Sequence, residues 1–177
     1  MFRPSPTLIL LLTVAGYCFG SAVAEDLADY IQPQYLARIS GWLSRHSDYR
    51  LAVDADCECT EDVTNMRNGS GWPPNPSFHP YFVVGDFAAD GAVDVAVGVV
   101  SGTTPKQFRV LILHGINPRG KARGDFLSEP FPLLNHGLFY GAPRPRPWRL
   151  LVGEFEAEGV IFMPNSHGYS IEEGEEG

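Results

Sequence analysis

The stretch that decides the fold is Gly85-Asp86-Phe87-Ala88-Ala89-Asp90-Gly91-Ala92-Val93-Asp94. Its glycines and aspartates are typical of a tight turn. Valines then recur at every second position, and the residues between them are small, which predicts a half-buried strand; the valines are Val93, Val95, Val97 and Val99. We therefore expect this segment to turn the chain into one strand of an antiparallel sheet.

The segments on either side predict the fold class. Helical periodicity is confined to residues 25–46, where Pro33 ends, kinks or restarts the helix. Residues 108–113 are apolar on both faces except at Arg109, which predicts a central strand. Other short β-type segments recur up to residue 171, with no helical pattern between them. The sequence thus predicts an α+β fold, with an N-terminal helical region followed by a mainly antiparallel sheet of about six strands.

The N-terminal residues indicate export. Residues 1–24 combine Arg3, a twelve-residue apolar stretch over 8–19 and a small-residue cleavage site ending at Ala24. This arrangement is typical of a secretory signal peptide, and twelve apolar residues are too few to span a membrane. We expect one globular domain over residues 25–171, an acidic tail over 172–177 and a periplasmic or secreted location.

The charge distribution narrows the class of partner. The net charge is −8 at pH 7, which argues against nucleic acid and anionic membranes as ligands. Residues 54–94 hold eight acidic side chains and only Arg67 as a base, whereas residues 106–149 hold eight basic ones. The two halves either neutralise each other or leave a basic patch for an acidic partner, such as a cell-wall polymer or a protein.

The aspartates of residues 85–94 have the spacing of a calcium loop. Counting from Asp86, carboxylates occupy positions one, five and nine, and Gly91 permits a sharp bend at position six. Calcium takes six to eight oxygen ligands, mostly from carboxylates and carbonyls. We expect Asp86, Asp90, the Ala92 carbonyl and Asp94 to be the ligands.

Residues 85–100 resemble the FG-GAP or VCBS-type repeat, which has the pattern G-D-F-N-G-D-G-x-x-D-hydrophobic-x-V. The resemblance implies calcium at the four residues just named. Ala88 departs from the pattern, because the repeat usually carries Asn or Asp there, so calcium would bind weakly unless water or another acidic residue replaces that oxygen. Only one such loop is present, so the propeller fold of the family is not expected.

A second acidic segment, residues 54–62, contains Cys57 and Cys59. In an oxidising compartment these cysteines would form a local disulfide, which requires a tight turn. A free or partner-linked pair and a soft-metal or redox site are the alternatives. The acidic side chains predict a solvated turn, which could also supply the oxygen that Ala88 lacks.

No catalytic motif is evident: H-E-x-x-H, G-x-S-x-G and a phosphate-binding glycine loop are all absent from the sequence. The sequence therefore favours an exported, non-catalytic binding or structural domain. The alternatives are a hydrolase built around the acidic loop, for example with His79, and an inhibitor or immunity-type protein acting on an enzyme in the same compartment.

Overall fold

The computed structural model describes residues 30–70, 73–115, 123–140, 149–155, 157 and 159–174. The predicted signal peptide lies outside these residues, as does the first part of the predicted helical region, residues 25–29.

The predicted α+β fold class is wrong, because the protein is mostly β. About 41% of it is strand and about 19% is helical. In place of one sheet of about six strands, the described residues form nine strands in two antiparallel sheets. The expected N-terminal helical region is reduced to one helix, α2 (Pro33–Leu43), which begins at Pro33. Proline fits a first helical position because its missing N–H would have no partner there.

The first sheet has β3 (Asp94–Ser101) and β4 (Gln107–Leu113) at its centre. Strand β5 (Phe126–Pro132) pairs with the far side of β4. Strands β1 (Tyr49–Leu51) and β2 (Phe82–Gly85) pair with opposite ends of β3 along its other side. The prediction of a central strand at residues 108–113 is confirmed.

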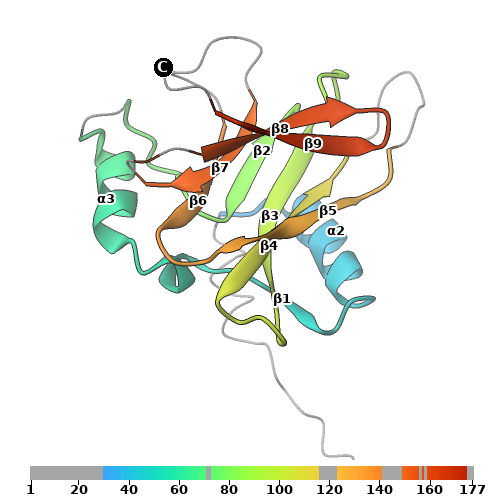
Figure 1. Ribbon diagram of the computed structural model, residues 1–177, viewed down its shortest axis with the longest axis horizontal. Coiled ribbons are helices and arrows are strands. Elements are labelled where there is room, and N and C mark those ends of the chain that lie inside the picture. The colour runs from blue at the N-terminus through green and yellow to red at the C-terminus, as the bar shows by residue number, and fades with distance from the viewer. Residues whose placement is uncertain are drawn as a thin grey trace, which may run out of the picture.

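The second sheet is a four-stranded meander in chain order. Its strands are β6 (His136–Phe139), β7 (Leu150–Glu154), β8 (Gly159–Asn165) and β9 (Gly168–Glu173). In Figure 1 its strands cross over those of the first sheet at a steep angle.

Strand β3 is buried on both faces, so the expectation of a half-buried strand is wrong. Val95, Val97 and Val99 pack with Ile39 and Trp42 of α2. Ala96 and Val100 pack in a second core shared with the second sheet. The first sheet therefore lies between α2 and the second sheet, and every side chain of β3 is enclosed.

Two further short elements complete the fold. The acidic segment forms a 3-10 turn, η1 (Asp54–Cys57), and then a helix, α3 (Thr60–Asn68). Glu61 and Asp62 lie in the first turn of α3, where acidic side chains favour a helix N-terminus. Gly69 ends the helix with a φ of 83°. Neither α3 nor β5 was expected from the sequence.

Candidate functional site

The loop between β2 and β3 is held in shape by its own carboxylates. The backbone N–H groups of Asp90 and Gly91 donate to the two Asp86 oxygens at 3.0 and 2.9 Å. The Ala92 N–H donates to Asp90 Oδ1 at 2.9 Å. Gly91 adopts a φ of 84°, a conformation that glycine accepts without strain. Two of the three aspartates therefore cap the turn that they were expected to build.

Asp94, the third aspartate, points into the protein. Its Oδ2 accepts the N–H groups of Phe87 at 3.1 Å and Ala88 at 3.2 Å. Its Oδ1 accepts the Gly115 N–H at 2.8 Å and lies 3.2 Å from His114 Nδ1, an ion-pair distance without the alignment of a hydrogen bond. A carboxylate has about four acceptor positions, so these contacts occupy the Asp94 side chain fully.

The pKa of Asp94 reflects this environment. Burial alone would raise it, but the contact with His114 and the N–H groups of Gly115 and Ala88 outweigh burial and lower it. Asp94 is therefore ionised at neutral pH, with its charge stabilised by polar groups on two segments of the chain, residues 87–88 and 114–115.

The loop is also tied to the second sheet. The Tyr140 ring lies so close to Gly85 that a Cβ there would be 2.3 Å from it, so this position requires glycine. The Tyr140 hydroxyl accepts the Asp86 N–H at 3.3 Å, and its ring meets Phe87 edge-on at 5.0 Å. On the other side of the loop, His114 stacks on Tyr169 of β9 at 5.7 Å. The loop thus joins the two sheets at one end of β3.

The structure places the three predicted calcium-binding aspartates in different surroundings. Asp86 and Asp90 are half-buried at the turn, whereas Asp94 faces inward towards His114. Among the described residues, no group of three or more His, Cys, Asp or Glu side chains could hold a metal ion. Calcium at Asp86, Asp90, Ala92 and Asp94 stays a prediction.

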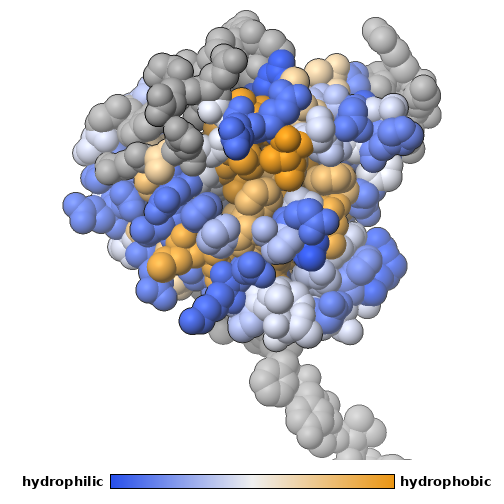
Figure 2. All heavy atoms as spheres, in the orientation of Figure 1, coloured by the Kyte–Doolittle hydropathy of each residue, from blue (hydrophilic) through white to orange (hydrophobic). Residues whose placement is uncertain are grey.

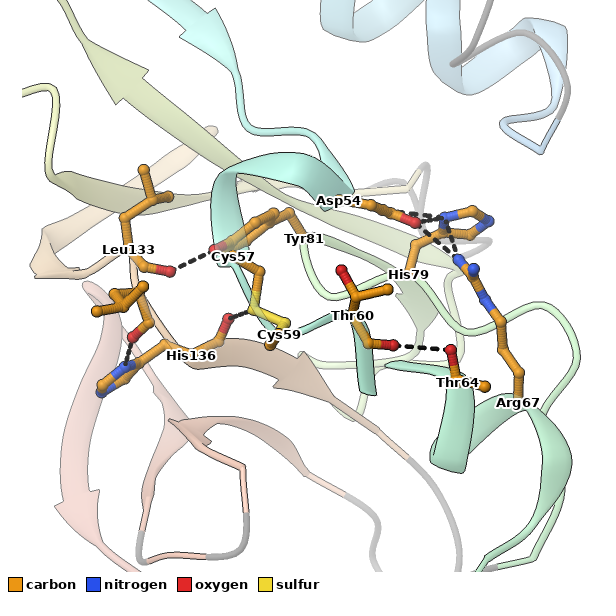
Figure 3. The surroundings of a disulfide bond; sticks show 11 residues. Asp54, Cys57, Cys59, Thr60, Thr64, Arg67, His79, Tyr81, Leu133 and His136 are labelled. Carbon is orange, nitrogen blue, oxygen red and sulfur yellow. Dashed lines mark hydrogen bonds and ion pairs between the residues drawn. A yellow bond between two sulfur atoms is a disulfide. The ribbon is translucent and has the colours of Figure 1, made fainter. Parts of the chain in front are cut away.

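Asp54, in the acidic segment, has partners of its own. Asp54 accepts from Arg67 at 2.7 Å and lies 3.0 Å from His79 Nδ1, and the ring of Tyr30 stacks on His79 at 3.5 Å. Figure 3 shows Asp54, His79 and Arg67 converging from three segments. His79 precedes β2, whereas Asp86 follows it, so His79 does not join the loop. The pKa of Asp54 is lowered, because the contacts with His79 and Arg67 outweigh burial.

Cys57 and Cys59 are joined in a disulfide between η1 and α3. Their exposures are only 0% and 3%, so the sulfurs are shielded from thiols in solution. Glu58 between them adopts a φ of 54°, the left-handed conformation. Figure 3 shows the disulfide beside Tyr81 and the His136 carbonyl, and Cys57 Sγ lies 3.6 Å from that oxygen.

Sequence reasoning missed the residues that complete the loop. His114, Tyr140 and Tyr169 come from later segments, and no spacing rule connects them to Asp94. His114 lies between the end of β4 and Gly115, a position typical of a strand end. The relevant signal was Gly115, whose backbone N–H reaches Asp94, but it could be interpreted only with the sheet register known.

Several basic residues of the predicted patch have partners within the chain. Arg109 donates to the Ser128 carbonyl at 2.7 Å and lies 3.8 Å from Glu129. Arg123 donates to the Asn165 carbonyl at 3.4 Å. Four others, Arg119, Lys121, Arg144 and Arg146, lie outside the described residues.

None of the described helices has the length and apolar character needed to cross a membrane. Comparisons with protein-family models, curated proteins and solved structures found no match. The resemblance to an FG-GAP or VCBS-type repeat therefore stays a prediction.

Proposed function

We propose that this protein is an exported, non-catalytic binding or structural domain, in which the aspartate loop locks the two sheets together. One observation carries the proposal: the Asp94 carboxylate is fully occupied by Phe87, Ala88, Gly115 and His114. A group engaged in this way stabilises the fold and has no acceptor position left for a ligand.

The same contacts favour a structural role over hydrolysis at this loop. Asp94 and His114 form the Asp–His pair that a hydrolase could use, but their side chains are only 1% and 3% exposed. A general base must come within hydrogen-bond reach of the proton that it removes. A substrate would have to displace Tyr169, which stacks on His114, to reach this pair.

Calcium, if bound, belongs to the outer part of the loop. We propose a weak site at Asp86 and Asp90, with water supplying most of the remaining oxygens, because Ala88 has no side-chain oxygen and Asp94 is occupied. Extracellular modules bind calcium at roughly 10⁻⁴–10⁻³ M, and the reduced ligand set places this site at the weak end.

A calcium titration followed by thermal melting tests the loop. Calcium should raise the melting temperature of the wild type and leave Asp90→Ala unchanged. Asp48→Ala, which removes an exposed carboxylate far from the loop in sequence, should respond as the wild type does. No shift in the wild type would remove calcium from the proposal. The locking role has its own test, the Asp94→Ala substitution described in the Discussion.

Export is tested separately by sequencing the amino terminus of the mature protein. We expect it to begin at Glu25, directly after the predicted cleavage site. A mature protein that retained Met1 would contradict the proposed location.

A further inference from the structure

A cavity of about 350 Å³ lies where three connections meet. Its walls come from η1, from the β3–β4 turn and from the β5–β6 turn. The Leu133 N–H donates to the Lys106 carbonyl at 3.1 Å, and the Asn135 N–H donates to the Cys57 carbonyl at 3.0 Å. The volume falls in the range of small-molecule sites, about 300–1,000 Å³, and the hydrogen bonds fix the walls relative to one another.

Glu58 is held at the rim of this cavity in an unfavourable conformation. It is the single residue between the two bonded cysteines, and its φ of 54° is uncommon for a residue with a Cβ. Backbone strain of this kind is concentrated at ligand-binding and catalytic sites. Its carboxylate is exposed and forms no ion pair or hydrogen bond with the described residues.

The charged groups around the cavity divide into one occupied group and two unoccupied ones. Asp56 is taken by Arg50, which donates to both carboxylate oxygens at 2.7 and 2.8 Å. Lys106 lines the wall that comes from the β3–β4 turn and, among the described residues, has no carboxylate within ion-pair distance. One carboxylate and one ammonium therefore face the cavity without bonding each other.

The third feature of the cavity is apolar. Leu133 is buried at its edge, while Leu134 beside it is 54% exposed. A single exposed leucine is ordinary. An exposed leucine next to a cavity that also presents one charge of each sign defines a more specific surface.

We propose that this cavity binds a zwitterion of amino-acid size with an apolar side chain. The ligand ammonium pairs with Glu58, its carboxylate pairs with Lys106, and its side chain covers Leu133 and Leu134. The disulfide contributes by fixing the position of Glu58. This inference goes beyond the proposed function and uses no residue of the aspartate loop, so failure of the calcium test leaves it unaffected.

A titration of the oxidised, isotope-labelled protein with L-leucine, followed by amide NMR shifts, tests the proposal. Shifts should be concentrated at residues 55–58, 105–106 and 133–134. N-acetyl-leucine lacks the ammonium and leucinamide lacks the carboxylate, so each should bind roughly fivefold more weakly, the size of a favourable exposed ion pair. Glycine, without the side chain, should bind more weakly than leucine.

Variants test which side chain pairs with each charged group of the ligand. Glu58→Gln should weaken binding of leucine but not of N-acetyl-leucine, and Lys106→Gln should weaken binding of leucine but not of leucinamide. Glu58→Gly relieves the backbone strain and removes the carboxylate, so it should be more stable than wild type but bind no better than Glu58→Gln. Asp90→Ala, in the remote loop, is the control and should bind normally.

Three outcomes would overturn the proposal. The first is the absence of shifts with leucine up to its solubility limit. The second is a set of shifts that lies elsewhere on the protein. The third is equal binding of leucine, N-acetyl-leucine and leucinamide, which would reduce the site to an apolar depression without charge recognition.

Discussion

Two contacts between an aspartate and a histidine occur among the described residues, and they lie in opposite surroundings. Asp94 and His114 are almost completely enclosed, with exposures of 1% and 3%. Asp54 and His79 lie near the surface, at 36% and 16%, and share the cluster with Arg67. In both contacts the partners outweigh burial and lower the pKa of the aspartate.

The difference shows that an aspartate–histidine contact can stabilise the core in one place and contribute little at the surface in another. A buried carboxylate must have every acceptor position filled, and Asp94 recruits three backbone N–H groups to achieve this. A surface carboxylate can rely on water, and its ion pairs gain little because water screens them. The folded core therefore depends on Asp94, whereas Asp54 joins η1, α3 and the segment before β2 without being essential.

Figure 2 shows that the surface itself is not uniformly hydrophilic. On the face shown, hydrophobic residues form a central strip, with hydrophilic residues around it. Ile171 of β9 is 41% exposed, so the second sheet carries apolar surface as well as the acidic Glu172 and Glu173. Strand β9 also extends to Glu173, two residues into the segment predicted to be an acidic tail.

The largest expected effect is that of Asp94→Ala. It leaves the N–H groups of Phe87, Ala88 and Gly115 without acceptors and His114 without its partner. Removing one member of a buried pair destabilises a protein by about 3–5 kcal/mol, so we expect a loss of that size in the free energy of unfolding. Denaturant unfolding measures it. Asp54→Ala is the matched control, and an equal loss in both variants would contradict the contrast.

The pH dependence of the free energy of unfolding should also be affected more by a change at Asp94 than by one at Asp54. Because the folded-state pKa of Asp94 lies below the ordinary value of 3.8, its stabilisation is present above that value and is lost as the pH falls through the lower folded-state pKa. Asp94→Asn cannot titrate, so its unfolding free energy should depend less on pH in this acidic window than that of the wild type. The change should be smaller for Asp54→Asn, and denaturant curves at several acidic pH values would reveal a reversed order.

Reduction of the Cys57–Cys59 disulfide should have an intermediate effect. The bond closes a loop of only three residues, for which the chain-entropy relation gives about 1–2 kcal/mol. Release of Glu58 from its left-handed conformation offsets part of this loss. Unfolding measured with and without reductant tests the expectation. A loss as large as that of Asp94→Ala would show that the disulfide stabilises the core as much as Asp94 does.

The sequence predicted local features well and tertiary partners poorly. The turn after β2, strand β3 and the central strand β4 were evident from their own residues. The burial of the second face of β3 was not evident from the sequence. Ala96 and Gly98 resemble small residues that face solvent, but they are small because neighbouring side chains pack closely against them. A Cβ at Gly98 would lie 3.0 Å from Tyr81.

The missed elements have equally specific causes. Strand β5 contains Pro130 and Pro132, which argue against a strand, and it is tolerated because it lies at the edge of its sheet. Helix α3 was missed because the acidic residues at its start were interpreted as part of a solvated turn. The partners of Asp54 and Asp94 could not be predicted, because His79 and His114 reach them only through the sheet topology.

The smallest expected effect is that of Asp54→Asn. The substitution keeps the shape of the side chain but removes the charge that Arg67 and His79 face, and an exposed ion pair contributes about 0–1 kcal/mol. High salt screens the wild-type contact, so the difference in unfolding free energy between wild type and Asp54→Asn should shrink as salt is added. The corresponding difference for Asp94→Asn should persist, because the Asp94 contacts lie away from solvent ions. Asp54 is 36% exposed and Asp94 only 1% exposed. An equal loss of both differences in salt would contradict the contrast that we draw from these exposures.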